Sequence, residues 1–447
     1  MLAFLSQLLI TCLAVALVVS AITIPQVSSP ELASPPRADA AKVVVAHLMV
    51  ANTFHYTPAD WEQDISLAAS SGLDAFALNI GYGEWYPNSV EAAYTAALNY
   101  PNFKLFISFD MTSIPCSSTD NADAMHELIA KYRLHPSQLQ YKGGPLVSTF
   151  GGEHCYFGKE SVNEGWASVM KRDHPGCTFI PSFFIQPAAS KDYSVLDGIF
   201  PWNSAWPLGP TDISFNYDRE FISGLRIDQS YMAGVSPWFF THYGFPYNKN
   251  FIFRGDDWLL ATRMEQLVQN RNEIGLVEVI TWNDYGESHY VGPIHGDQPG
   301  SEEWVNGFDH QAWLPLLSYY ITAFKTGVYP MGKERIFLWM RPHPTAASAS
   351  DPLGRPANAD WTEDYMWVVA LLDAPGDITL SCGPSNEVTS FTTPGLQKAK
   401  LPLKADCQPH AAITRGGVPV VILDPQEISF KMQPGRYNFN AYVAASL

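Results

Sequence analysis

Residues 281–290, which read TWNDYGESHY, bring together side chains that can do acid–base chemistry. The acids Asp284 and Glu287 lie three positions apart, and Gly286 between them permits a sharp turn. Two carboxyl groups near one bond can divide a reaction: one protonates a leaving oxygen, and the other activates water or attacks carbon. Cleavage of a glycosidic bond needs such a pair, so these two acids are the predicted catalytic residues.

The same segment permits two other interpretations. Together with His289, the two acids offer ligand types that a metal ion accepts, but no second histidine is convincingly placed. We therefore expect neither a metal nor another cofactor. The acids could also form a charge pair that serves only structure, since carboxylate networks occur without catalysis.

A parallel sheet covered by helices is predicted to position this segment. Apolar runs of strand length cover residues 43–49, 75–80, 104–109, 146–150, 178–184, 198–202, 232–238 and 277–282. Amphipathic runs of helical length cover residues 58–70, 90–98, 122–132, 163–171, 215–225, 257–270 and 312–324. Strands that alternate with helices predict an α/β fold, and eight such units predict a (β/α)8 TIM-type barrel. A doubly wound open sheet is the alternative, but no glycine-rich phosphate loop follows the first strand.

Barrel enzymes carry their chemistry at the carboxyl ends of the strands, and acids, amides and indoles dominate those positions here. The residues expected to bind substrate are Asn79, Asp110, Glu153, Trp202, Trp206, Trp238, Asn283, Tyr285 and His289. Amides and carboxylates hydrogen-bond to hydroxyl groups and indoles stack on sugar faces, so a neutral polyhydroxyl substrate is expected. For each tryptophan, packing at the top of the barrel is the competing interpretation, as loop capping is for Asp110.

The two ends of the sequence differ in residue composition and pattern from the predicted barrel, to which residues 42–331 are assigned. Residues 1–21 are mostly apolar and predict a signal peptide, and residues 22–41 read as a linker rich in Pro, Ser and Ala. An uncleaved membrane anchor is the competing interpretation of the apolar run. Short β-like runs at 366–372, 377–381, 418–422 and 436–443 predict a C-terminal all-β, sandwich-like domain over residues 332–447. We expect a secreted, extracellular monomer with no stable membrane association after cleavage.

Cysteine positions suggest disulfides, which an oxidising compartment favours. Cys382 and Cys407 stand alone in the last third of the sequence and are expected to pair. Cys116 and Cys155 follow two consecutive predicted strands, so their loops should be neighbours and Cys116–Cys155 is the preferred second pair. Cys177 is then left free, although the sequence alone does not decide which of these three is unpaired.

Composition excludes two broad classes of protein. The chain has 47% hydrophobic and only 16% charged residues, which supports a large core and excludes a disordered chain. Asp and Glu number 44 against 27 Lys and Arg, which gives a formal net charge of −17. Nucleic-acid binding normally needs a basic stripe, so no nucleic-acid partner is expected.

Seven segments of the sequence together resemble the fungal α-1,3-glucanases, or mutanases, of glycoside hydrolase family 71. They read VVAHLMVANTFHYTPADWEQDI, GLDAFALNIG, FKLFISFDM, PLVSTFGGEHCYFG, DGIFPW, VSPWFF and VEVITWNDYGESHYVGP, in that order along the chain. The resemblance implies a (β/α)8 barrel with an appended β domain and secretion. It also implies hydrolysis of α-1,3-glucosidic bonds in fungal cell-wall α-glucan or in mutan, with inversion. The acidic pair of the family falls on Asp284 and Glu287.

Analogy with related endo-mannosidase barrels, which carry a carboxylate pair of the same spacing, makes Glu287 the expected acid and Asp284 the expected base. A raised pKa is expected for Glu287, because another acid, Trp282 and Tyr285 lie close to it in sequence. Inversion would require about 6.5–9.5 Å between the two carboxyl groups, and retention about 5–5.5 Å. Two alternatives stay open: a secreted glucan-binding protein without turnover, and a barrel hydrolase for another glycosidic linkage. The sequence does not distinguish endo from exo action.

Overall fold

The computed structural model describes residues 41–296, 298 and 300–447. The predicted signal peptide at residues 1–21, and the predicted linker except for residue 41, lie outside the described residues. Within the described part of the chain, no helix is both long and apolar enough to span a membrane.

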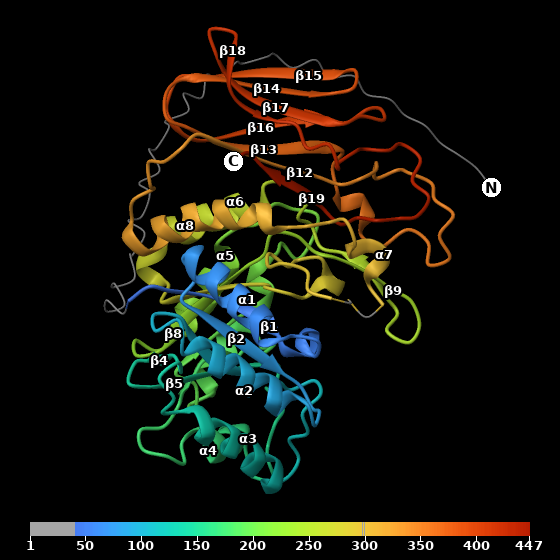
Figure 1. Cartoon of the computed structure of the whole chain (residues 1–447). Helices are drawn as coiled ribbons and strands as arrows, with labels where there is room; N and C mark the ends of the chain where they lie inside the picture. Colours follow the sequence, from blue (N-terminus) through green and yellow to red (C-terminus); the bar gives the residue numbers. More distant parts are fainter. Residues whose placement is uncertain (1–40, 297, 299) are drawn as a thin grey trace, which may run out of the picture. The chain divides into compact units, whose positions relative to one another are not determined.

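A curled sheet of parallel strands forms the centre of the fold (Figure 1). Its parallel strands are β1 (Val43–Met49), β2 (Ala75–Ile80), β3 (Lys104–Asp110), β5 (Gly144–Phe150), β6 (Thr178–Phe179), β7 (Gly198–Ile199), β8 (Ser230–Val235) and β11 (Leu276–Val279). They are hydrogen-bonded in the order β6-β5-β3-β2-β1-β11-β8-β7, with the short antiparallel strand β4 (Gln140–Tyr141) also on β5. Backbone hydrogen bonds from Asp197 to Phe179 and from Phe200 to Pro181 connect the two ends of this order. The arrangement is consistent with a TIM-type barrel.

Strand positions follow the apolar runs of the sequence. The predicted boundaries of β1 and β2 are confirmed, and every residue of β2 and of β8 is buried, as in a parallel sheet covered on both faces. Strands β6 and β7 are much shorter than predicted. Pro181 and Pro201 follow them closely, and proline has no amide hydrogen to extend the ladder.

Helices cover the outside of the sheet. They are α1 (Pro58–Ser70), α2 (Tyr86–Ala97), α3 (Thr119–Tyr132), α4 (Val162–Met170), α5 (Asn216–Gly224), α6 (Leu259–Gln269), α7 (Glu302–Val305) and α8 (Leu314–Thr326). Helix α1 begins as predicted, because Thr57 and Asp60 form a capping box around Pro58. Between β6 and β7 the chain makes no α-helix and only the 3₁₀ segment η2 (Pro187–Asp192).

Between β8 and α6 the chain forms an antiparallel hairpin that the sequence analysis did not anticipate. Its strands are β9 (Phe240–Tyr243) and β10 (Lys249–Ile252), and Tyr243 pairs with Lys249 at the end nearest the turn. The loop that follows β9 projects from the surface (Figure 1).

The C-terminal region contains two antiparallel sheets of four strands each. One has the order β16 (Gly395–Pro402), β13 (Tyr365–Leu372), β12 (Arg335–Met340) and β19 (Tyr442–Ala445). The other has the order β15 (Ser385–Phe391), β14 (Gly376–Cys382), β17 (Pro409–Arg415) and β18 (Val418–Leu423). The predicted runs at 366–372, 377–381 and 418–422 are confirmed as strands. Of the predicted run at 436–443, only the end forms a strand. Strands β12, β15, β16 and β17 were not predicted.

Strand β12 joins the C-terminal sheets to the parallel-sheet region, because its side chains point alternately to its two faces. Ile336 and Leu338 pack into the core shared by the two C-terminal sheets, whereas Phe337 and Trp339 pack into the core beside the parallel sheet. The Trp339 indole also donates a hydrogen bond to the Asp257 carbonyl at 2.8 Å. The C-terminal sheets are therefore part of the same packed structure as the helices next to them.

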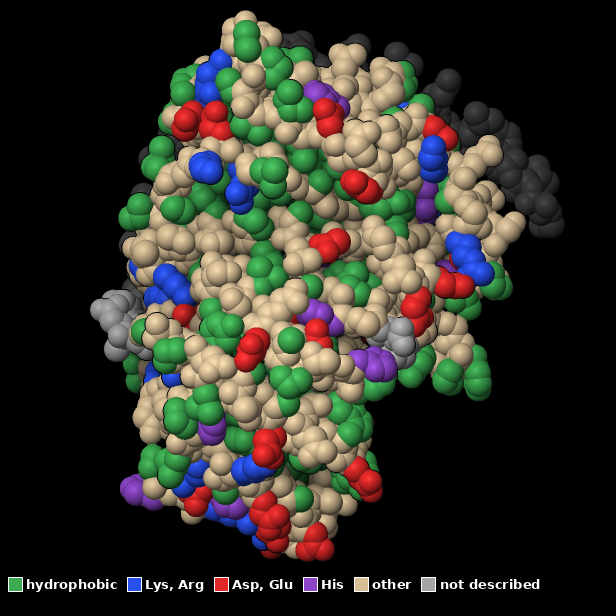
Figure 2. All heavy atoms as spheres, viewed as in Figure 1, with side chains coloured by type: hydrophobic (Ala, Val, Ile, Leu, Met, Phe, Trp, Pro, Cys, Tyr) green, Lys and Arg blue, Asp and Glu red, His purple; other side chains and the backbone are tan. Residues whose placement is uncertain are grey.

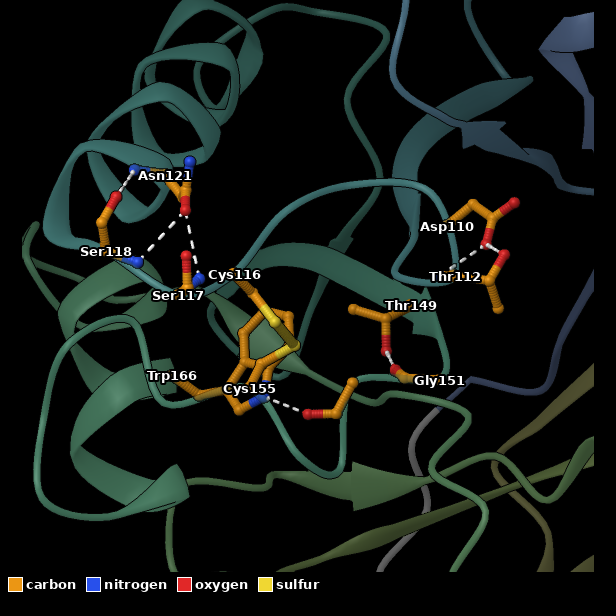
Figure 3. Close-up of a disulfide and its surroundings, with 11 residues drawn as sticks. Asp110, Thr112, Cys116, Ser117, Ser118, Asn121, Thr149, Gly151, Cys155 and Trp166 are labelled. Carbon is orange, nitrogen blue, oxygen red and sulfur yellow. Dashed lines mark hydrogen bonds between the residues drawn. A yellow bond between two sulfur atoms is a disulfide. The ribbon is translucent and has the colours of Figure 1, made fainter.

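Both predicted disulfides are present. Cys116–Cys155 joins the loop after β3 to the loop after β5, close to Trp166 on α4 (Figure 3). Cys382–Cys407 lies in the C-terminal sheets, and Cys177 is buried and free. The first bridge ties together two loops that lead from the carboxyl ends of neighbouring strands.

Candidate active site

A cavity of about 450 Å³ opens at the carboxyl ends of the parallel strands. Its lining residues are His47, Met49, Ala51, Asn52, Asn79, Asp110, Thr112, Phe150, Trp202, Tyr243, Tyr247, Lys249, Asp284, Tyr285, Gly286, Glu287, Gln298 and Ser301. Most of these side chains are hydroxyl, amide, carboxyl or aromatic groups. The cavity therefore lies where barrel enzymes carry their chemistry.

Asp284 and Glu287 share this cavity because the loop after β11 is fixed to the end of β1. Asn283 accepts a hydrogen bond from the Met49 amide at 2.7 Å and donates one to the Met49 carbonyl at 3.1 Å. The Asp284 amide donates to Thr281 Oγ1 at 2.8 Å. The chain then makes the 3₁₀ segment η5 (Tyr285–Glu287), which brings the second acid back to the first.

A glycine is required within this turn. A Cβ atom at Gly286 would collide with the Tyr243 hydroxyl, so only glycine lets the hairpin approach the acid-bearing loop this closely. Carboxyl oxygens of Asp284 and Glu287 lie within 4.8 Å of each other and of a ring nitrogen of His289. The two acids are thus close enough to act on one bond and to influence each other's charge.

Two nitrogen groups hold Glu287. His289 Nε2 lies 3.2 Å from Glu287 Oε2, and Lys249 Nζ donates to Glu287 Oε1 at 3.4 Å. The fully buried His289 ring also has its Nδ1 3.1 Å from Thr281 Oγ1. Because a carboxylate accepts, His289 Nε2 carries the proton of the first contact. These contacts orient Glu287 and favour its ionised form.

The electrostatics of the pair differ from the expectation. Burial, together with the negative charge of Glu287, raises the pKa of Asp284 to about 6. Burial also acts to raise the pKa of Glu287, but the contacts with His289 and Lys249 outweigh it and the pKa is lowered. The predicted raised pKa of Glu287 is therefore wrong, because its two stabilising partners were not part of that prediction.

A buried polar pair supports the floor of the cavity. His47 on β1 and Glu278 on β11 are hydrogen-bonded at 2.7 Å, and both are almost fully buried. The His47 ring also packs edge-on against Trp202, with ring centroids 4.9 Å apart. This pair was not predicted, although a histidine and a glutamate inside two apolar strand runs were a usable signal.

Four of the nine predicted substrate-binding residues line the cavity together with the two acids. They are Asn79, Asp110, Trp202 and Tyr285. Asp110 also caps its own loop, since its Oδ1 accepts hydrogen bonds from the Thr112 amide and hydroxyl (Figure 3). Loop capping and a place at the cavity therefore coexist at Asp110.

The other five predicted residues lie outside the cavity lining. Trp206 and Trp238 are buried and donate to the carbonyl groups of Trp238 and Phe439, respectively. Glu153 accepts a hydrogen bond from the Phe184 amide at 3.3 Å. Asn283 fixes the acid-bearing loop, and His289 contacts Glu287, as described above. These two support the acids without facing the cavity.

The hairpin contributes the residues that the sequence analysis missed most completely. Tyr243, Tyr247 and Lys249 all line the cavity. Burial and then the charge of Asp284 raise the pKa of the Tyr243 hydroxyl. The hairpin thus forms one wall of the site and brings a cation to it.

The donor atoms of Asp284, Glu287 and His289 are also the one set of three that the described residues offer to a metal ion. Two of these donors already satisfy each other, because His289 donates to Glu287.

On the face shown in Figure 2, the described Lys and Arg side chains are scattered and do not form a continuous basic stripe. The arrangement is therefore better suited to acid–base chemistry on a neutral substrate than to binding polyanions.

Comparison with known proteins gives consistent similarities. The sequence model of glycosyl hydrolase family 71 matches residues 40–447. The glucan endo-1,3-alpha-glucosidase agn1 of Schizosaccharomyces pombe is 38% identical over 404 residues, 88% of this chain and 92% of that protein. A mutanase of Penicillium rubens is 33% identical over 421 residues, 89% of this chain and 87% of that protein.

Similarity to solved structures is weaker. A GH99 endo-alpha-mannosidase from Bacteroides thetaiotaomicron superposes with a TM-score of 0.49 and 10% identity, covering 63% of this chain and 97% of that one.

Proposed function

Because the chain belongs to glycosyl hydrolase family 71, we propose that it is a secreted enzyme that hydrolyses α-1,3-glucosidic bonds of an α-glucan. The observation that carries this proposal is the placement of Asp284 and Glu287 together in a cavity of about 450 Å³. Amide, hydroxyl and aromatic side chains form its other walls, and such groups recognise neutral sugars.

In the proposed reaction, Glu287 is the general acid and Asp284 is the general base. Asp284 takes a proton from water as the water oxygen bonds to the anomeric carbon. The glycosidic bond breaks with its electron pair on the leaving oxygen, and Glu287 gives that oxygen a proton. The products are two shorter glucans, one with a new reducing end.

This assignment requires the proton to move when substrate binds, because in the free site Asp284 has the higher pKa of the two acids and is the one that is protonated first. A sugar that enters the cavity excludes water and separates Lys249 from Glu287, and both changes raise the pKa of Glu287 and also that of Asp284. The transfer to Glu287 therefore also requires a hydrogen bond from its protonated form to the glycosidic oxygen, which favours that form. Once Glu287 carries the proton, the negative charge that raises the pKa of Asp284 is gone. Asp284 can then ionise beside His47, which lowers its pKa.

The proposed stereochemical outcome is inversion, as the family resemblance implies. In the free site the nearest carboxyl oxygens lie within 4.8 Å, closer than the separation of about 6.5–9.5 Å that leaves room for the attacking water. Inversion therefore requires the carboxyl groups to move apart in the complex. For Glu287 to make this movement, its contacts with His289 at 3.2 Å and with Lys249 at 3.4 Å must both lengthen.

The fold is also part of the proposal. We infer that the parallel strands form a closed (β/α)8 barrel over residues 42–331, supported by the hydrogen bonds between the segments of β6 and β7. The two antiparallel sheets would then be an accessory sandwich-like domain over residues 332–447, which packs on the barrel through β12.

Release of reducing sugar from insoluble α-1,3-glucan tests the function. Wild-type protein should release reducing ends, and Asp284→Asn and Glu287→Gln should release almost none while they still sediment with the polymer. Sedimentation without release by the wild type would show a binding protein rather than an enzyme. Release of reducing sugar only from a glucan with another linkage would show that the proposed specificity for α-1,3-glucosidic bonds is wrong.

A further inference from the structure

The β9–β10 hairpin does more than border the cavity, because it carries two of the most exposed aromatic side chains of the described residues. Phe245 is 91% exposed and Tyr247 is 67% exposed, and both lie in the turn between the two strands. Exposed aromatic side chains grouped on one protrusion lose favourable burial and often mark a binding surface. Tyr247 also lines the cavity, so this surface continues the site.

The turn is held in a defined shape. The Asn248 amide donates to the Gly244 carbonyl at 2.8 Å, and the Asn248 side chain donates to the Pro246 carbonyl at 3.1 Å. The Tyr247 ring packs against Tyr243, with centroids 5.2 Å apart. The aromatic rings are therefore presented by a fixed turn, which lowers the entropy lost on binding.

The base of the hairpin is tied to the chain that follows β12. His242 contacts Asn250 at 2.8 Å and Asp351 at 3.0 Å, and Asn250 donates to the Leu353 carbonyl at 3.2 Å. The Ile252 amide donates to the Ala357 carbonyl at 3.1 Å. These bonds fix the base of the hairpin to residues 351–357.

We propose that Phe245 and Tyr247 form a platform on which glucosyl units of the same α-1,3-glucan chain stack after that chain leaves the cavity. The inference rests on the proposed function and deepens it, since it assigns polymer recognition to the hairpin. The occupant follows from continuity with the cavity, because Tyr247 belongs both to the cavity lining and to the exposed turn. Aromatic faces suit the apolar faces of sugar rings and need no charge.

Two substrates separate the platform from the cavity: insoluble α-1,3-glucan, which extends beyond the cavity, and a short α-1,3-linked tetrasaccharide. The informative quantity is the ratio of kcat/KM on the polymer to kcat/KM on the tetrasaccharide. Phe245→Ala should lower this ratio about tenfold, the effect of removing an aromatic anchor. Phe245→Trp should restore it, because an aromatic face is kept.

Leu134→Ala is the matched control, since Leu134 is 86% exposed but lies between α3 and β4, before the amino end of β5. An unchanged ratio in Phe245→Ala, or an equal fall of the ratio in Leu134→Ala, would overturn the proposed platform. The proposed function would still stand in that case, provided that the wild-type protein turns over both substrates. Absence of wild-type turnover on both substrates would instead remove the proposed function and the platform with it.

Discussion

Lys249 Nζ lies 3.4 Å from Oε1 of Glu287, although 38 positions separate the two residues in the sequence. The contact joins the β9–β10 hairpin to the loop after β11, so the wall of the cavity acts together with His289 to lower the pKa of one of its acids. Lys249 is 53% exposed, which makes this a contact that an entering sugar can replace. The proposed exchange of the proton between the two acids depends on this relationship.

Replacement of Lys249 by Met should shift the pH dependence of kcat/KM. The ammonium group lowers the pKa of Glu287 and also that of Asp284, so its loss raises both. Both limbs of the bell-shaped profile should then move to higher pH. Lys249→Arg keeps the charge and should leave the limbs in place. Limbs that stay fixed in Lys249→Met would show that Lys249 does not influence the acids.

Asp284→Asn should stabilise the folded protein in a pH-dependent way. A carboxyl group whose folded pKa is raised from 3.8 to about 6 favours the folded state while protonated and opposes it once ionised. The free energy of unfolding of the variant should exceed that of the wild type by up to about 3 kcal/mol at pH 7, and the difference should vanish near pH 3, below the unfolded pKa. Urea unfolding at both pH values measures it. An equal difference in the free energy of unfolding at both pH values would rule out the charge of Asp284 as its cause.

Loss of the His47 imidazole should destabilise the fold. His47→Ala leaves the buried Glu278 carboxyl without its partner at 2.7 Å, and breaking such a pair costs about 3 kcal/mol. Lys131→Met is a suitable comparison, because it breaks the exposed pair with Glu91 and should leave the midpoint of urea unfolding unchanged. Similar effects of both variants would argue against a special role for the buried pair.

The roles of the two acids can be separated with an activated substrate. An α-glucosyl fluoride of a short α-1,3-glucan needs little help from an acid, because fluoride is a good leaving group. Glu287→Gln should therefore keep much more activity on the fluoride than on the polymer, relative to wild type, whereas Asp284→Asn should lose activity on both. Added azide should restore turnover of the fluoride in Asp284→Asn. The reverse pattern would exchange the two roles.

Local features of the sequence predicted local features of the fold. Thr57, Pro58 and Asp60 mark the start of α1, and the apolar runs of β1 and β2 have the predicted boundaries. Asp284 and Glu287 were identified because their spacing is short. Trp206 and Trp238 show the limit of this reasoning, since their position near strand ends left substrate binding and packing as alternatives, and both side chains are buried.

Features that depend on distant contacts were not predictable from spacing. The pKa of Glu287 depends on His289 and on Lys249, and the approach of Lys249 depends on the hairpin and on the missing side chain of Gly286. The runs that form β6 and β7 were overestimated, because hydrophobicity was weighed more than the position of Pro181 and Pro201. His47 and Glu278 form a pair only because their strands are neighbours.

The most direct test of the acid pair is time-resolved ¹H NMR of α-1,3-glucan during hydrolysis. Wild-type protein should first produce the β-anomer at the new reducing end, and Asp284→Asn and Glu287→Gln should reduce that signal by a factor of about 10³ or more. Circular dichroism should show that both variants remain folded. Product signals that grow at the wild-type rate in either variant would contradict the assignment of that acid to the reaction.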